Sequence, residues 1–293
     1  MKPAPFTYHD PATLDEAVAL LGRLENARAL AGGQSLMPMM NFRFVMPDHI
    51  VDLNAIEGLD SIRVQAQRLT FGAMARQRAI ERSAAVHAAC PIMTEALAHV
   101  GHRQTRNRGT IGGSLCHLDP AAELANLASL HDAVLTARSG AGSRTIAFTD
   151  FAQGYLTNAL ADGELLTAIE FDCWPAQHGY GFEEMARRRG DFAMTIVSAL
   201  VLLDGAQRVE RAAVCVSAVE AVPVRLTAVE KMLAGELPGA DLYRAAGVEA
   251  EKLDAMEDAY VSARYRKHLA RVLVYRALEK AVASARKRGH ADA

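Results

Sequence analysis

The chain has 293 residues and a mass of 31.6 kDa, which exceeds the roughly 100 to 200 residues of a typical single domain, so we expect two or three packed units. Its composition, with 51% hydrophobic and 23% charged residues, is that of an ordinary globular protein. A formal net charge of -2 argues against a general nucleic-acid binder.

The N-terminal sequence has no apolar stretch of the length that a secretory signal needs. The longest apolar run, residues 197–203, is far shorter than a membrane span. We therefore expect a cytoplasmic protein without a membrane-spanning segment. The four cysteines show no CxxC spacing, so a disulfide framework and a zinc or iron–sulfur site are disfavoured. A redox centre would have to be a bound organic cofactor or belong to a partner.

The N-terminal region shows a β-turn-helix-β pattern. Thr13 followed by Glu16 resembles a capping box, and apolar residues then recur at helical spacing up to Leu24. The helix is expected to end near residues 25–26. A short apolar strand then leads into a Gly-Gly pair, and residues 49–53 predict the next strand.

The middle of the chain alternates strands and helices. The pattern predicts a hairpin over 62–74, helices over 91–101 and 121–133, and strands over 134–138, 144–148 and 164–171. Gly140 and Gly142 stand in the sequence Ser-Gly-Ala-Gly-Ser, which we interpret as a hairpin turn between two of these strands. Residues 174–179 are the best linker in the chain, and we place the main domain boundary there.

Beyond this linker, residues 195–203 and 209–219 are rich in Val and Ile, which favours paired strands. Apolar residues then recur every three or four positions in three segments, which predicts helices over 225–235, 241–256 and 262–288. The last third is therefore expected to be a small α+β unit.

Two glycine pairs, in AGGQSL (31–36) and TIGGSL (110–115), are interpreted as two turns. Glycine allows backbone amides to approach a ligand closely, and consecutive amides in a turn form an anion site. A diphosphate, a phosphate sugar or a nucleotide would suit such turns, and either pair alone is also compatible with an ordinary tight turn. Three flanking arginines raise the local potential, or form a solvated face or a partner contact: Arg103, Arg106 and Arg108.

Other site types are disfavoured. The glycines at 140–142 do not complete GxGxxG, and no GxxxxGK[ST] is present, so a Rossmann fingerprint and a P-loop are excluded. A metal site built from His102, Cys116 and His117 lacks ligand spacing. A Ser114-His117-Asp119 triad is disfavoured because such near neighbours do not easily form a hydrogen-bonded relay and no GxSxG elbow exists.

Four segments carry a resemblance to a known family: LAGGQSLMPMM (30–40), RNRGTIGGSLCHLDPAAEL (106–124), ARRRGDFAM (186–194) and SARYRKHLARVLVYRAL (262–278). The chain closely resembles the FAD-binding medium subunit of molybdenum hydroxylases, a family that includes carbon monoxide dehydrogenase and the flavin portion of xanthine dehydrogenase. The resemblance implies an α/β, two-subdomain FAD-binding fold of the vanillyl-alcohol-oxidase type, followed by a C-terminal α+β domain with an antiparallel sheet and helices. The implied ranges are 1–55, 56–175 and 180–290.

The resemblance also implies site residues. One group would wrap the FAD diphosphate: Ala31, Gly32, Gly33, Gln34 and Ser35. A second group would complete that site: Thr110, Ile111, Gly112, Gly113 and Ser114, the last of which replaces an Asn of many relatives.

Three further positions follow from the resemblance. Glu123 would lie near the adenosine ribose, with helix capping as the alternative. The Leu166 backbone would lie by the isoalloxazine edge, with a simple core role as the alternative. Residues 188–194 would lie near the ring, and Met194 replaces a lysine of the xanthine dehydrogenase branch, which makes NAD less certain as the final acceptor.

The resemblance implies that this chain transfers electrons from partner subunits to an external acceptor. Substrate hydroxylation would occur at a molybdenum-pterin centre in a large partner subunit, and electrons would pass through [2Fe-2S] clusters of a small partner subunit to FAD and then to an external acceptor. A dimer of heterotrimers is the expected assembly, and this chain would contribute no catalytic acid–base residue. Two alternatives remain: a free-standing FAD oxidoreductase of the same fold, and a scaffold subunit without flavin. The substrate, determined in another subunit, is left open.

Overall fold

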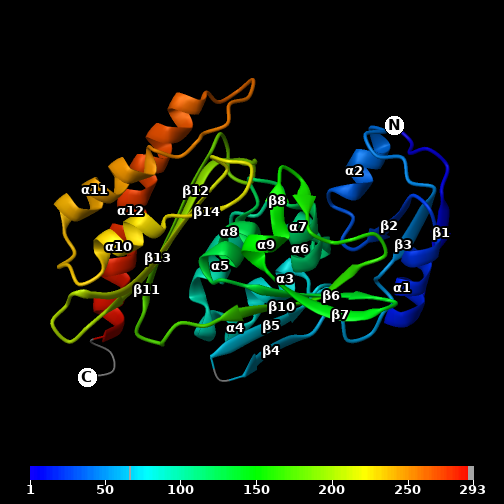
Figure 1. Ribbon diagram of the computed structural model, residues 1–293, viewed down its shortest axis with the longest axis horizontal. Coiled ribbons are helices and arrows are strands. Elements are labelled where there is room, and N and C mark those ends of the chain that lie inside the picture. The colour runs from blue at the N-terminus through cyan, green and yellow to red at the C-terminus, as the bar shows by residue number, and fades with distance from the viewer. Residues whose placement is uncertain (66, 290–293) are drawn as a thin grey trace.

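The structure is a computed structural model that describes residues 1–65 and 67–289. Three groups of elements follow one another along the long axis of the molecule, and the N- and C-terminal ends lie at opposite sides (Figure 1). The first group has a small parallel sheet, the second a five-stranded antiparallel sheet, and the third a four-stranded antiparallel sheet covered by helices. The expected combination of α/β and α+β architecture is confirmed.

The first group contains a three-stranded parallel sheet in the order β1-β3-β2. The capping box predicted before its first long helix is present, because the Thr13 hydroxyl accepts from the Glu16 amide at 3.2 Å and the Glu16 carboxylate accepts from the Thr13 amide at 3.2 Å. The elements are β1 (Thr7–His9), α1 (Leu14–Arg23), β2 (Ala27–Leu30), α2 (Leu36–Asn41) and β3 (His49–Asp52).

The second group is built on an antiparallel sheet in the order β4-β5-β10-β6-β7. Ser139 pairs with Gly142 between β6 and β7, so the predicted hairpin turn is confirmed. The strands are β4 (Ile62–Gln65), β5 (Arg68–Gly72), β6 (Val134–Ser139), β7 (Gly142–Ala147) and β10 (Leu165–Asp172), with a small hairpin of β8 (Ala152–Gly154) and β9 (Thr157–Asn158).

The helices of this group lie together on the sheet side shown uppermost in Figure 1. Helix α8 is buried along its whole length, and its core extends from Phe71 of the central sheet to Ile196 and Leu200 of the C-terminal sheet. The helices are α3 (Gln77–Arg82), α4 (Ala84–Ala89), α5 (Pro91–Leu97), α6 (Arg103–Arg108), α7 (Ile111–His117), α8 (Glu123–Leu130) and α9 (Phe148–Phe151).

The third group has an antiparallel sheet in the order β11-β12-β13-β14, with the long helix α12 against β11 and β12. Strand β11 was not predicted, because glycines lower strand propensity. These glycines have a packing role: a Cβ on Gly181 would lie 2.1 Å from the Ala277 carbonyl oxygen of α12. The elements are β11 (Gly179–Ala186), β12 (Ala193–Leu203), β13 (Val209–Ser217), β14 (Val224–Arg225), α10 (Thr227–Leu233), α11 (Ala240–Ala250) and α12 (Ala263–Gly289).

Across residues 1–65 and 67–289, every helix is too short or too polar to cross a membrane.

Candidate functional site

The first glycine segment contacts the second and the backbone of the two residues just before it, although the two segments lie far apart in the sequence. A Cβ on Gly32 would lie 2.3 Å from the Arg108 carbonyl oxygen and 2.8 Å from the Gly109 Cα. A Cβ on Gly113 would lie 3.4 Å from the Ala31 Cβ. Real Cβ atoms do not approach backbone atoms as closely as 2.3 Å, so the glycine at position 32 is required for this contact.

The first glycine segment presents open backbone donors. Gly33 has a φ of 72°, a left-handed conformation that glycine adopts without a steric penalty, and α2 starts just after it. Within the described part of the chain, the amides of the four residues before α2 donate to no protein acceptor: Gly32, Gly33, Gln34 and Ser35. Such a row of unpaired amides before a helix is suited to an anionic group.

The second glycine pair differs from the expectation, because it is not a turn. Thr110 is the N-cap of α7 and its hydroxyl accepts from the Gly113 amide at 3.0 Å, so both glycines lie in the first turn of a helix. The amides of Ile111 and Gly112 donate to the carbonyls of Ala75 and Ala73 at 3.1 and 2.9 Å, and the Ser114 amide donates within the helix.

The second pair therefore does not supply the row of free amides that the sequence suggested. Gly112 instead allows close packing, since its Cβ would lie 2.5 Å from the Ala73 carbonyl oxygen. Thr110 is 2% exposed and its hydroxyl caps α7, so the half-buried Ser114 is the hydroxyl side chain of this segment that is more accessible to a ligand.

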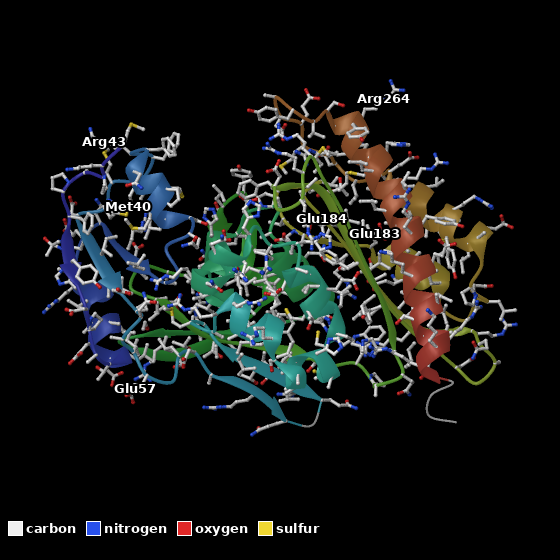
Figure 2. All side chains as sticks on the ribbon, turned by 180° about the vertical axis from the view of Figure 1, so that it is seen from behind. Met40, Arg43, Glu57, Glu183, Glu184 and Arg264 are labelled. Atoms are coloured by element: carbon white, nitrogen blue, oxygen red, sulfur yellow. The ribbon has the colours of Figure 1, made fainter. Side chains whose placement is uncertain are left out.

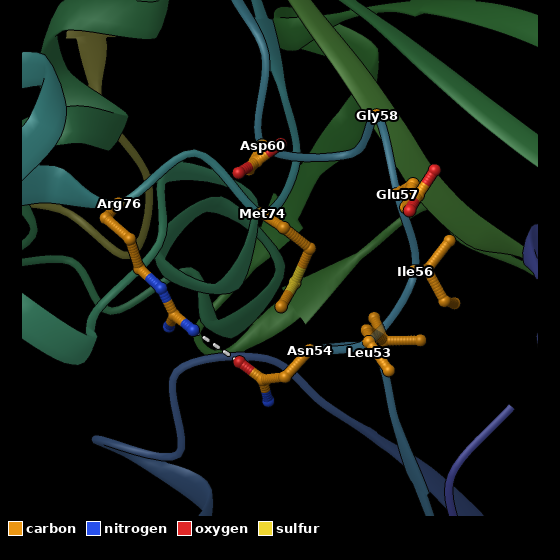
Figure 3. A pocket seen from close by; sticks show the side chains of 9 residues that line it. Leu53, Asn54, Ile56, Glu57, Gly58, Asp60, Met74 and Arg76 are labelled. Atoms are coloured by element: carbon orange, nitrogen blue, oxygen red, sulfur yellow. Dashed lines mark hydrogen bonds between the residues drawn. The ribbon is translucent and has the colours of Figure 1, made fainter. Parts of the chain in front are cut away.

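A polar bridge joins the first group of elements to the second beside these segments. The Arg76 guanidinium donates to Asn54 Oδ1 and to the Arg108 carbonyl, and Asn54 Nδ2 donates to the Ala31 carbonyl at 3.0 Å. Burial, followed by the nearby Arg108 charge, lowers the pKa of Arg76. Figure 3 shows the Arg76–Asn54 bond at the edge of a pocket of about 290 Å³ that also includes Met74.

Neither Asn54 nor Arg76 was identified from the sequence. Asn54 stands two residues after β3, at the carboxyl end of a parallel strand, and this position is the signal that points to it.

The three flanking arginines have different positions. Arg106 is buried and binds Glu81 through two nitrogens, at 2.9 and 3.2 Å, and the Val100 carbonyl at 2.9 Å, so it stabilises the α3–α6 packing. Arg103 and Arg108 are exposed. Only the Arg108 backbone takes part in the contact between the glycine segments.

Glu123 is the first residue of α8 and is 8% exposed. Burial, reinforced by the nearby Glu184 carboxylate, raises the pKa of Glu123 to about 8. The Glu184 side chain lies in the middle of the molecule, 3.6 Å from His99 Nδ1, and among the described residues its Oε2 has no hydrogen-bond partner (Figure 2). A carboxyl group that stays protonated near neutral pH can donate a hydrogen bond as well as accept one. Glu184 was not identified from the sequence.

The two positions expected near a ring have clear packing roles. Leu166 is 2% exposed and its side chain belongs to the central core, so only its backbone is available to a ligand. It lies where the pairing of β10 with β6 is irregular. Met194 lies in β12, and its carbonyl accepts from Arg266 at 2.6 Å. The loop before it is exposed, with Arg188 paired to Asp191 at 3.1 Å.

Two of the residues considered for a metal site or a triad, Asp119 and Cys116, have ordinary structural roles. The Asp119 carboxylate accepts from the Ala121 amide at 2.8 Å in the turn before α8. Burial raises the pKa of the Cys116 thiol to about 12, so this cysteine is an inert thiol at neutral pH. In the part of the chain that the structure describes, no cluster of three His, Cys, Asp or Glu side chains is placed to hold a metal.

Two family models match the chain. Residues 4–172 match the FAD binding domain in molybdopterin dehydrogenase, and residues 180–281 match the CO dehydrogenase flavoprotein C-terminal domain.

Full-length relatives agree with these models. The chain is 36% identical over 288 residues to the carbon monoxide dehydrogenase medium chain of Afipia carboxidovorans, which covers 98% of this chain and 100% of the relative. It is 35% identical to the 6-hydroxypseudooxynicotine dehydrogenase complex subunit alpha of Paenarthrobacter nicotinovorans, over 98% of this chain and 97% of the relative. A solved chain of quinoline 2-oxidoreductase from Pseudomonas putida 86 superposes with a TM-score of 0.93, 35% identity and coverage of 97% and 99%.

Proposed function

The chain belongs to the family of FAD-binding medium subunits of molybdenum hydroxylases, and from this membership we propose that it carries FAD for a heterotrimeric enzyme of that kind. It is an oxidoreductase subunit with an FAD-binding fold. When bound, FAD accepts electrons singly and delivers them in pairs, which connects one-electron iron–sulfur donors to a two-electron acceptor. This chain binds and orients the cofactor.

One observation carries the proposal. The segment with four unpaired amides, residues 32–35, lies in backbone contact with the residues that precede α7. A diphosphate brings about two negative charges, and charge-assisted hydrogen bonds contribute roughly 1.5 to 3 kcal/mol each. The residues present therefore fit the diphosphate of a dinucleotide.

We assign distinct roles to the two segments. The amides of Gly32 to Ser35 bind the diphosphate directly, with Ala31 at the contact to α7 and Gln34 held by its bond to the Gly32 carbonyl at 3.2 Å. In the second segment, Ser114 donates through its hydroxyl, and Thr110 supports the site by capping α7. The remaining members have packing roles: Ile111 is buried, Gly112 lies against Ala73, and Gly113 packs closely against Ala31.

Two more residues complete the assignment. Glu123 bonds a ribose hydroxyl, a role for which a protonated carboxyl has both a donor and an acceptor atom. Leu166 contributes its backbone at the edge of the isoalloxazine, while its side chain fills the core.

The proposed partners are a large subunit with the molybdopterin-type molybdenum cofactor and a small subunit with [2Fe-2S] clusters, assembled as a dimer of heterotrimers in the cytoplasm. The relatives are named as a medium chain and as a subunit of a dehydrogenase complex, which supports a multi-subunit enzyme. The proposed domains are 1–55 and 56–175 for FAD binding and 180–290 for the C-terminal domain.

Purification of the full chain from its native host, by an affinity tag on this chain, tests the proposal. We expect the visible absorption bands of oxidised flavin together with molybdenum, iron and two further polypeptides. A yellow chain that purifies alone, without metals, would instead indicate a free-standing FAD oxidoreductase. A colourless chain that also fails to bind added FAD would indicate a scaffold subunit.

A further inference from the structure

Arg266, near the start of α12, joins three segments of the chain. This residue is only 7% exposed. One guanidinium nitrogen donates to the Met194 carbonyl at 2.6 Å and also to the Ala218 carbonyl, and another donates to Asp258 Oδ2 at 2.5 Å. A planar group with several fixed donors is suited to such a convergence, whereas a lysine offers a single point charge.

Ala218 connects Arg266 to the FAD-binding part of the chain by hydrogen bonds. It follows β13 and has a φ of 63°, a left-handed conformation that is unfavourable for a residue with a Cβ. Its carbonyl accepts from Arg266, while its amide donates to the Pro120 carbonyl at 2.9 Å. A short path of hydrogen bonds therefore leads from α12 to the connection between α7 and α8.

This connection carries Glu123, which lies three residues after Pro120 at the first turn of α8. The next turn of α8 is fixed independently, because Asn126 Nδ2 donates to Ser217 Oγ at 2.8 Å and the Ser198 hydroxyl donates to Asn126 Oδ1. Helix α8 is thus fixed to the C-terminal sheet through Asn126, and the turn before it is fixed through Ala218.

Asp258 holds the guanidinium from the other side. Hydrogen bonds keep the pKa of Asp258 below its usual value, the strongest from the Tyr260 amide and others from the Val261 amide and Arg266. The carboxylate therefore stays charged at neutral pH. Arg187 lies over the Tyr260 ring at 4.5 Å, which connects the same loop to the exposed segment before Met194.

We propose that Arg266 is a positioning residue for the FAD site: by holding Ala218 in its left-handed conformation it fixes Pro120, and through it the Glu123 carboxyl that binds the cofactor. This inference rests on the proposed function. It assigns to a C-terminal helix an indirect influence on the affinity for FAD. Among the hydrogen-bond partners of Arg266 in the described chain, none belongs to the two glycine segments.

The test is a double-mutant cycle on the full chain, with FAD affinity measured by titrating flavin-free protein. We expect Arg266→Met to weaken FAD binding about tenfold, which corresponds to about 1.4 kcal/mol. In a Glu123→Gln background the same change should weaken binding less than twofold, because residues that act along one path are not additive. A purely structural role would instead produce the same tenfold loss in both backgrounds.

Arg271→Met is the matched control. Arg271 lies on the same helix, is half-exposed and pairs with Glu251 at 3.5 Å, so its loss should leave FAD affinity within twofold. If Arg266→Met does not fold, as judged by circular dichroism, Arg266→Lys takes its place in the cycle.

Additive effects, or equal affinity of wild type and the Arg266 variant, would overturn the inference while leaving the proposed function intact. A wild-type chain that binds no FAD would overturn the proposed function itself.

Discussion

Gly113 on α7 lies opposite Ala31 of the first glycine segment, with room for little more than a hydrogen atom on its Cα. A Cβ at position 113 would lie 3.4 Å from the Ala31 Cβ and 2.9 Å from the Thr110 hydroxyl that caps the helix. The close approach of the two segments therefore depends on the absence of a side chain at this position.

Gly113→Val tests this contact. A branched side chain pushes the first glycine segment away and displaces the Thr110 cap, but valine is not a worse helix former than glycine, so we expect a folded chain. FAD content after purification should fall at least tenfold relative to wild type, measured by absorbance after extraction. Gly140→Val, at a hairpin position with open space around it, should keep wild-type flavin content. Equal flavin in both variants would contradict the assigned site.

Gly33→Val tests the left-handed residue. A side chain at a φ of 72° costs about 1 to 2 kcal/mol, so both unfolding stability and FAD binding should decrease. Gly235→Val provides the control, because Gly235 has a φ of 78°, faces open space and lies in the C-terminal unit. This control should lose a similar amount of stability in urea unfolding yet retain flavin. Loss of flavin in both variants would attribute the effect to general instability.

Glu123→Gln should change how stability depends on pH. The folded pKa is about 8 and the ordinary value is 4.5, so between these pH values the folded chain holds a proton that the unfolded chain has released. The contribution of Glu123 to the free energy of unfolding is therefore complete below pH 4.5 and is lost as the pH rises toward 8, with a slope of up to about 1.4 kcal/mol per pH unit.

Urea unfolding of flavin-free protein at pH 5, 6.5 and 8 measures this slope. The wild-type chain should lose stability across the series, and Glu123→Gln should lose less of it. The exposed Glu25, changed to Gln in the same way, should reproduce the wild-type slope. A slope that Glu123→Gln leaves unchanged would show that this carboxyl ionises normally in the folded chain.

Arg76→Met should loosen the junction beside the first glycine segment. It removes the donors to Asn54 and to the Arg108 carbonyl, and the loss of a hydrogen bond from a charged group typically costs about 1.5 to 3 kcal/mol. We expect weaker FAD binding and faster proteolysis near residue 54. Arg68→Met, which removes an exposed pair with Glu170, should stay within about 0.5 kcal/mol of wild type. Wild-type FAD affinity in Arg76→Met would show that the bridge does not support the site.

Local signals in the sequence predicted local structure well. The Thr13 and Glu16 pair specifies its own helix start, and the β-branched runs specify β12 and β13, because each depends on neighbours within a few residues. Helix α11 ends at Ala250, earlier than the apolar spacing up to residue 256 suggested. The first glycine pair also lies where its sequence suggested, in a loop with open amides.

Positions that depend on distant partners were predicted less well. TIGGSL looked like a turn because two glycines disfavour a helix, yet the carbonyls of Ala73 and Ala75, which lie nearly forty residues earlier, bind its amides and stabilise the start of α7. Arg106 was expected to raise the local potential or to lie on a solvated face or partner contact, whereas it is buried and paired with Glu81. No spacing rule within a single sequence reveals these pairings.

The order of strands in the central sheet affects how the chain folds during synthesis. Strand β10 lies between β5 and β6 and pairs with both, although β5 precedes it by nearly a hundred residues. Until residue 172 has left the ribosome, the facing edges of the two older hairpins remain unpaired, and such edges invite association with other chains. A nascent chain stalled just before β10 is therefore the species most prone to aggregation, and binding a chaperone at that stage would protect it.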